Sequence, residues 1–293
     1  MKIALIGANG QVGSDILTAA RGSDIEVVSL THDRCDVRDR RSLDGAFGAL
    51  GPHDVVVNTA AYHRVDECET HPEESFAVNA CGAFNAAAAA KERRAAIVNF
   101  STDYVFSGSK GEPYVESDHP DPINVYGASK LAGEMLVRIA NEKHYIVRVA
   151  SVFGIAGSSG KGGNFVETIM AKAKSGQQAH VVDDMVMSPS YSADVAGLLL
   201  ALLERQAPYG TYHLANGGQC SWHEYAAAIY RMSGHSTEVE RTSSLARPAP
   251  ARRPPNSALT SENLARVGLY ARPWREGLED YLKRKGYIDA AKV

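Results

Sequence analysis

The chain has 293 residues, of which 44% are hydrophobic and 22% are charged, and its formal net charge is −3. This length and composition allow a large buried core, in one large α/β domain or in a domain with a smaller appendage. The basic residues are scattered, so we expect no nucleic-acid-binding face. No apolar run approaches the roughly 20 residues of a membrane span, so we expect no membrane partner either.

The cysteines and the N-terminus indicate the compartment. The four cysteines (Cys35, Cys68, Cys81 and Cys220) form no Cys-x-x-Cys pair and no recurring spacing. This pattern is typical of reduced thiols. The N-terminus enters a short apolar run without a charged leader. The sequence therefore predicts a cytoplasmic protein.

Short apolar runs rich in β-branched residues recur through the first half of the chain. They are KIALIG at the N-terminus, IEVVSL (25–30), DVVVNTA (54–60), AAIVNFST (95–102) and YIVRVAS (145–151). Each is continuously apolar, as expected for parallel strands that are covered on both faces. Helix-like segments separate them, notably at 11–20, 72–92 and 125–141. This alternation predicts an α/β fold with a Rossmann-type, doubly wound parallel sheet.

The pattern changes after about residue 152. Shorter elements follow, with helices predicted at 164–175, 191–205, 221–232 and 273–285 and a strand at 211–215. A flexible glycine-rich loop is predicted at 157–163 and a proline-rich loop at 246–256. We predict a dinucleotide-binding Rossmann domain over residues 1–152. Residues 153–293 are predicted to form mainly a smaller α/β substrate-binding lobe that is interleaved with it.

The sequence GANGQVG lies between the first predicted strand and the first predicted helix. Its three glycines permit a tight turn, close approach of the backbone to a pyrophosphate, and close packing of helix on strand. The free N–H groups of the helix N-terminus then face the phosphates. A glycine triplet alone also fits a plain turn, but its place at the head of a strand–helix series predicts a dinucleotide site. The predicted loop residues are Gly7, Asn9, Gly10, Gln11, Val12 and Gly13.

The second predicted strand ends at Leu30, where an acidic residue usually binds the adenosine ribose. Asp33 lies 20 residues past Gly13, but Arg34 beside it would favour a 2′-phosphate. NADP and NAD therefore both stay open as the cofactor, with NADPH favoured. Further predicted cofactor contacts are Asp36 and Val37, which would flank the adenine, and Ala60 and Ala61.

Tyr126 and Lys130 lie four residues apart in a predicted helix and so project from one face. A nearby ammonium favours the phenolate, so Lys130 is predicted to lower the pKa of Tyr126, which would donate a proton to a carbonyl oxygen. Thr102, just after the strand at 95–101 and beside Ser101, would hold that oxygen. Two ordinary polar residues and a turn hydroxyl are the plain alternative. The order of glycine loop, strand-end Thr and Tyr-x-x-x-Lys is more specific than any one of these motifs.

At these motifs the chain resembles the extended short-chain dehydrogenase/reductase family and, within it, the dTDP-4-dehydrorhamnose reductases. The resemblance runs nearly end to end and includes GANGQVG, STDYVFSG, NVYGASKLAGE, GGNFVETIM, SPSYSADVA and RRPPNSAL. It implies that Thr102, Tyr126 and Lys130 carry the chemistry and that Lys130 also holds the nicotinamide ribose. It also implies a substrate site near the nucleotide-sugar, formed by Ser101, Thr102, Asp103, Val105, Asn164, Arg253 and Asn256.

The reaction implied by the resemblance is hydride transfer from NADPH or NADH to the C4 keto group of a dTDP-4-dehydro-6-deoxy sugar, which gives dTDP-L-rhamnose. Related dehydratases carry Thr-Asp-Glu where this chain has Thr102-Asp103-Tyr104, so dehydration is not expected. The reductases often have Trp at the position of Val152. The alternatives are a 4-ketoreductase or epimerase acting on another nucleotide-sugar, and a non-catalytic NADP-binding regulatory subunit.

A metal site is the weakest of the candidate features. His63, Glu67 and His71 are spaced four apart, which fits a metal-binding helical face, but an ordinary solvated helix is the more common arrangement. We therefore assign no metal ligand. Some members of the resembled family are described as Mg²⁺-linked dimers. Mg²⁺ cannot be located in this sequence, and a homodimer is an expectation from the resemblance alone.

Overall fold

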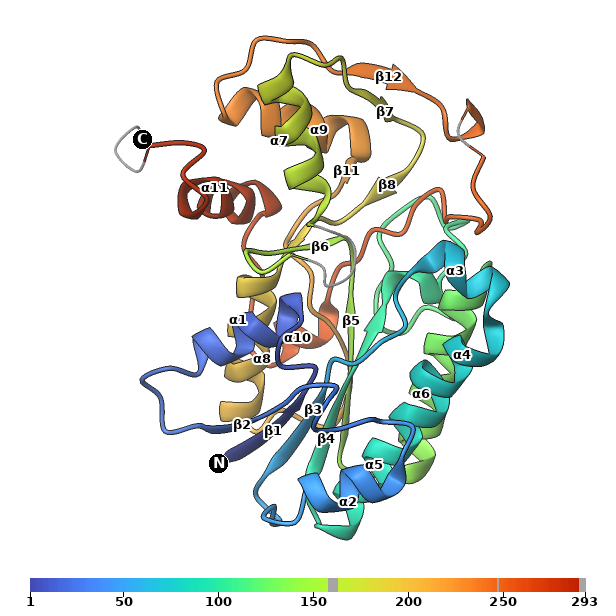
Figure 1. The fold of residues 1–293 in the computed structure, drawn as a ribbon, viewed down its shortest axis with the longest axis vertical. Coiled ribbons are helices and arrows are strands. Elements are labelled where there is room, and N and C mark those ends of the chain that lie inside the picture. The colour runs from blue at the N-terminus through green and yellow to red at the C-terminus, as the bar shows by residue number, and fades with distance from the viewer. Residues whose placement is uncertain (158–162, 247, 290–293) are drawn as a thin grey trace.

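The computed structural model describes residues 1–157, 163–246 and 248–289. A six-stranded sheet lies at its centre in the order β10-β5-β4-β3-β1-β2, and every neighbouring pair in it is parallel (Figure 1). The strands are β1 (Lys2–Ile6), β2 (Glu26–Leu30), β3 (Val55–Asn58), β4 (Ala96–Thr102), β5 (His144–Val149) and β10 (Gly210–His213). The predicted parallel, doubly wound sheet is confirmed.

Helices cover both faces of this sheet (Figure 1). One face carries α1 (Gln11–Ala19), α8 (Ser192–Glu204) and α10 (Glu262–Arg266), and the other carries α2 (Arg40–Ala46), α5 (Ala83–Glu92) and α6 (Val125–Ala140). The strands are therefore buried on both sides, which explains why their sequences are continuously apolar rather than alternating.

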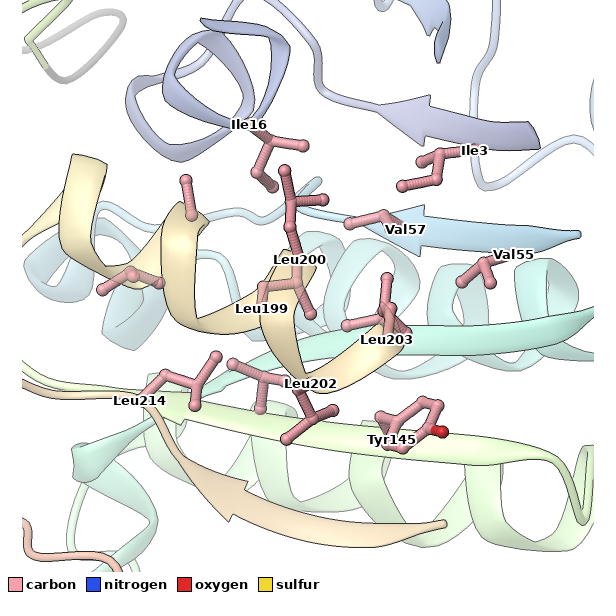
Figure 2. Close-up of a cluster of buried hydrophobic side chains, with 14 of the residues drawn as sticks. Ile3, Ile16, Val55, Val57, Tyr145, Leu199, Leu200, Leu202, Leu203 and Leu214 are labelled. Atoms are coloured by element: carbon pink, nitrogen blue, oxygen red, sulfur yellow. The ribbon is translucent and has the colours of Figure 1, made fainter. Parts of the chain in front are cut away.

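Helix α8 supplies four buried leucines to the core of the sheet (Figure 2). Leu199, Leu200, Leu202 and Leu203 belong to one buried cluster with Ile16 of α1 and with residues of the strands (Figure 2). Burying one such side chain contributes about 1.5–3 kcal/mol. Strand β10 likewise pairs with β5 at the edge of the main sheet, where Tyr212 lies opposite Val147. Segments from the C-terminal half thus complete the sheet and its core.

The predicted helix at 72–92 contains a π-helical segment. It consists of α4 (Pro72–Phe76), the π segment (Ala77–Gly82) and α5, and α3 (Val65–Thr70) precedes it. The π segment directs Asn79 between two other elements. Its side chain donates to Ser129 of α6 (3.0 Å) and accepts from the backbone N–H of Tyr62 (2.9 Å). Such π turns are rare in proteins overall, but they often occur at functional sites. This one fixes the loop after β3 against α6.

The C-terminal lobe has its own core. Its helices are α7 (Phe165–Ser175), α9 (Trp222–Met232) and α11 (Trp274–Arg284), and its short strands are β6 (Val152–Phe153), β7 (His180–Val182), β8 (Val186–Met187), β9 (Ser190–Tyr191), β11 (Cys220–Ser221) and β12 (Glu240–Thr242). Phe153, Tyr191, Tyr225 and Tyr281 are among the buried side chains that pack between them.

Three remaining features bear on the sequence predictions. Most of the glycine-rich loop at 157–163 lies outside the described residues. None of the described helices is long and apolar enough to span a bilayer. Finally, Ser221 and Glu224 form a reciprocal capping box at the start of α9.

Candidate active site

A cavity of about 790 Å³ lies at the carboxyl ends of the central strands. Its walls come from the ends of β1, β3, β4 and β5 and, on the opposite side, from the C-terminal lobe. The chain runs from β1 to β2 on one side and returns to β3 on the other, so the strand order reverses between β1 and β3. Open α/β sheets bind their ligands at this kind of switch point.

The glycine loop forms one wall of the cavity. Gly7 has a φ of 76°, and a Cβ there would lie 2.5 Å from Thr59 Oγ1. Gly10 is the N-cap residue of α1 and makes no side-chain hydrogen bond. The first backbone N–H groups of the helix are therefore not satisfied by a capping side chain. A Cβ on Gly13 would lie 2.3 Å from the carbonyl oxygen of Gly7. Gly13 does not line the cavity but lets α1 pack on the loop. A backbone cradle at a helix N-terminus fits a dinucleotide pyrophosphate.

Gly7→Ala is expected to weaken NADPH binding by about tenfold or more, because the new methyl group meets Thr59 and the cradle must open. Gly22→Ala is the matched control. Gly22 also has a positive φ, 79°, but a Cβ there meets no atom within 4 Å. Titration of NADPH fluorescence measures both variants. Equal loss of affinity in the two would mean that backbone strain, and not the cradle, limits binding.

The adenosine end of the cavity differs from the sequence prediction. His32, Asp36, Val37 and Arg38 line it, whereas Asp33 and Arg34 do not. Arg38 makes ion pairs of 2.7 Å with both Asp36 and Glu74. Its hydrogen bonds lower the pKa of Asp36 to about 2. The arginine at this end of the cavity is therefore Arg38, which lies two residues after Asp36 in the sequence.

The three predicted catalytic side chains lie in one wall of the cavity. Thr102 ends β4 directly before a 3-10 turn (Asp103–Val105), and its hydroxyl donates to Asp103 Oδ1 over 2.9 Å. Asn124 caps α6 by accepting from the N–H of Gly127 (2.7 Å), which sets the first turn and Tyr126 within it. The Thr102 hydroxyl is near enough to the Tyr126 phenol to affect its pKa. Lys130 follows one turn later.

The electrostatics of this wall correct one expectation. Burial raises the pKa of the Tyr126 phenol, and the nearby Thr102 hydroxyl only partly opposes this. Burial lowers the pKa of Lys130 to about 8 and raises that of Asp103 to about 6. The prediction that Lys130 brings the Tyr126 pKa toward neutrality is wrong for the groups of this chain, because desolvation is the largest effect on this phenol and Lys130 is not among the main groups that shift it. Tyr126 is held as the neutral phenol, the form that donates a proton.

The predicted substrate residues divide into two groups. Ser101, Asp103 and Asn164 line the cavity, as do the predicted cofactor residues Ala60 and Ala61. Val105, Arg253 and Asn256 do not. Val105 is fully buried, Arg253 makes two hydrogen bonds to Asp66 (2.6 and 2.7 Å), and Asn256 accepts from the backbone N–H of Ala258. Arg253 is also hydrogen-bonded with Tyr104, which does line the cavity, so it supports that wall from behind.

Sequence reasoning missed an aromatic wall contributed by the C-terminal lobe. Phe153, Phe165, Trp222 and Tyr225 line the cavity opposite the catalytic strands. The centroid of the Phe165 ring lies 4.6 Å from that of the Trp222 ring and 5.6 Å from that of the Tyr225 ring. Trp222 and Tyr225 lie three residues apart on α9, a spacing that by itself is typical of packing residues. They do pack on neighbours, but they also face the cavity. The only local signal was Phe165, which follows the predicted substrate residue Asn164.

The helical face considered for a metal is occupied by other contacts. Glu67 pairs with Arg64 (2.8 Å) and accepts from the Tyr62 hydroxyl (3.2 Å), while His71 Nδ1 faces the Glu67 carbonyl oxygen (3.2 Å). Within the described ranges, no group of three or more His, Cys, Asp or Glu side chains is arranged to hold a metal ion.

Known proteins resemble this chain over nearly its full length. The family model of the RmlD substrate binding domain matches residues 1–286. The spore coat polysaccharide biosynthesis protein SpsK of Bacillus subtilis is 36% identical over 97% of this chain and 98% of its own. The dTDP-4-dehydrorhamnose reductase of Mycolicibacterium smegmatis is 38% identical over 95% and 84%, respectively. The crystal structure of dTDP-4-dehydrorhamnose reductase from Bacillus anthracis in complex with NADP has a TM-score of 0.90 and 33% identity, and the match covers 97% of this chain and 99% of that one. The chain thus belongs to the RmlD family of dTDP-4-dehydrorhamnose reductases.

Proposed function

We propose that the protein catalyses the NAD(P)H-dependent reduction of the C4 keto group of a dTDP-4-dehydro-6-deoxy sugar, giving dTDP-L-rhamnose. The observation that carries this proposal is that Thr102, Tyr126 and Lys130 line the same cavity as the glycine loop. The names of the full-length relatives support it.

The proposed roles follow from the geometry of the wall. When bound, the reduced nicotinamide supplies the hydride to C4. Tyr126 donates its proton to the C4 oxygen as negative charge develops there, and the Thr102 hydroxyl holds that oxygen in place. Lys130 lies on the same helical face, where a cationic amine stabilises the phenolate that Tyr126 leaves behind. In the structure the single Thr102 hydroxyl proton is donated to Asp103 Oδ1 (2.9 Å), so this hydroxyl turns from the carboxyl group to the C4 oxygen when the substrate binds.

Cofactor binding is assigned to one end of the cavity. The glycine loop would hold the pyrophosphate, and Asp36 and Val37 would flank the adenosine. NADPH is favoured over NADH because His32 and Arg38 line this end and the relative from Bacillus anthracis binds NADP. Arg38 is already paired with two carboxylates, so NADH is expected to be accepted as well.

Substrate binding is assigned to the other end. Ser101, Asp103 and Asn164 offer polar groups, and Phe165 and Trp222 offer aromatic faces on which a nucleobase or a sugar ring packs. We also propose the domain division near residue 152, which the separate core of the lobe supports. A homodimer, a cytoplasmic location and a role for Mg²⁺ stay predictions.

Oxidation of NADPH and NADH at 340 nm tests the function. The substrate is dTDP-4-dehydro-6-deoxy-L-sugar generated in situ, and the product is identified by chromatography. We expect turnover with both cofactors and dTDP-L-rhamnose as the product. Tight NADPH binding without turnover of this sugar would contradict the assignment and direct the search to other keto-sugars of nucleotides.

A further inference from the structure

A buried carboxylate behind the catalytic wall is not used by the roles assigned so far. Glu134 lies on α6 four residues after Lys130 and eight after Tyr126, so the three share one helical face. Its side chain is completely buried. Glu134 Oε1 accepts from Ser101 Oγ (2.6 Å) and Arg148 Nε (2.8 Å), and Oε2 accepts from Arg148 Nη2 (2.8 Å).

These bonds join the catalytic helix to the end of the catalytic strand. Ser101 precedes Thr102 in β4, and in the β4–β5 pairing Ser101 lies opposite Arg148. Glu134 therefore binds the strand pair one residue before the hydroxyl that meets Tyr126. Because the anchor lies on the same face of α6 as Tyr126, it limits how far the helix can slide or rotate relative to Thr102.

Glu134 also acts on Lys130 through its charge. The Lys130 amine is almost completely buried, which favours its neutral form, and the charge of Glu134 opposes this. Other ionisable groups on elements packed against α6 also have partners: Asp66 pairs with Arg253, Glu67 with Arg64 and Glu74 with Arg38, while Glu69 accepts from the backbone N–H of Val125 and Asp103 from Thr102. In the described part of the chain, Glu134 is the charged group that shifts the Lys130 pKa.

A buried ion pair contributes little net stability, since desolvation of both charges offsets their attraction. We propose that Glu134 is a positioning residue, which anchors α6 on β4 through Ser101 and supplies the counter-charge for the Lys130 ammonium. The inference rests on the proposed reductase function, in which Lys130 works as a cation.

The pH dependence of kcat/KM separates the two roles. In the wild type, activity falls as pH rises through the Lys130 pKa of about 8, because the amine loses its proton. Glu134→Gln alone leaves the buried Arg148 guanidinium without a carboxylate partner, so the test variant is Glu134→Gln with Arg148→Met, which removes both charges. In this double variant the alkaline fall of kcat/KM is expected to begin about one pH unit lower than in the wild type. Its kcat is expected to be reduced by about tenfold or more. Ser101→Ala breaks the anchor and keeps the Glu134 charge, so it is expected to lower kcat without moving the alkaline limb of the pH profile. Because Ser101 also lines the cavity, KM is measured with it.

Arg138→Gln is the matched control. The substitution removes the exposed Arg138 guanidinium, whose Nη2 lies 3.3 Å from Glu134 Oε2, farther than that of Arg148. It keeps the Glu134 carboxylate and its bond to Ser101, so the alkaline limb of the pH profile is expected to match that of the wild type. The Lys130 titration is also read without turnover, by NMR of side-chain amines in ¹⁵N-lysine-labelled protein, with the signal assigned from Lys130→Met. If the wild type does not turn over this sugar, the proposed function fails, while the NMR titration still tests the counter-charge. A folded double variant with the wild-type Lys130 titration and the wild-type limb would overturn the proposal.

Discussion

Replacing Tyr126 with Phe is expected to reduce kcat by about 10³-fold, with little change in NADPH affinity. The substitution removes one hydroxyl group and keeps the ring, which packs edge-on against Tyr104 at a centroid distance of 6.0 Å. The lost group is the proposed proton donor, which lies beside the Thr102 hydroxyl. Turnover measured at 340 nm and NADPH titration give the two readouts.

Tyr145→Phe is the control for this substitution. Tyr145 lies in β5, away from the cavity, and its hydroxyl donates to the Ala207 carbonyl oxygen over 2.7 Å. Its loss is expected to cost about 1 kcal/mol of stability and to leave kcat unchanged. If Tyr126→Phe retained more than about a tenth of the wild-type kcat, the proton would have to come from another group. Asp103, a buried carboxyl group with a pKa raised to about 6, would be the first candidate.

The fold was predictable where local pattern and tertiary environment agree. The β-branched run at 95–102 is uninterrupted because β4 has neighbours on both sides and helices on both faces, and the strand was found almost to the residue. The short run at 211–215 predicts a strand, but nothing in it predicts that this strand pairs with β5. Its pairing with β5 is set by the leucines of α8, which bring this segment back to the sheet, and no local period encodes that contact.

The candidate site shows the same division. The glycine loop and Tyr126-x-x-x-Lys130 are local motifs, so their positions follow from spacing. Arg253 pairs with Asp66, 187 residues away in sequence, and no spacing rule indicates such a contact. The direction of the Tyr126 pKa shift was predicted wrongly for a related reason. The charge of Lys130 can be read from the sequence, but the desolvation that sets the Tyr126 pKa depends on how the whole wall packs.

Gly127→Ala is expected to destabilise the protein by about 3 kcal/mol and to lower the melting temperature by roughly 6 °C or more. A Cβ on Gly127 would lie 2.1 Å from the Tyr104 carbonyl oxygen and 3.0 Å from Pro122 Cβ. Tyr104 belongs to the 3-10 turn that follows Thr102, so backbone meets backbone and a side-chain rotation cannot relieve the clash. The first turn of α6 must then move away from the end of β4. Because Tyr126 lies in that turn, kcat is expected to fall together with stability.

Gly197→Ala separates this contact from the general effect of placing Ala in a helix. Gly197 lies inside α8, and a Cβ there would meet no atom within 4 Å. The substitution is therefore expected to stabilise the protein by about 0.5–1 kcal/mol, through the lower conformational entropy of the unfolded chain. Thermal unfolding and kcat are measured for both variants. A Gly127→Ala protein with wild-type melting temperature and wild-type kcat would show that α6 can shift without disturbing Tyr126 and Thr102. Close contact between helix and turn would then not be what holds the pair together.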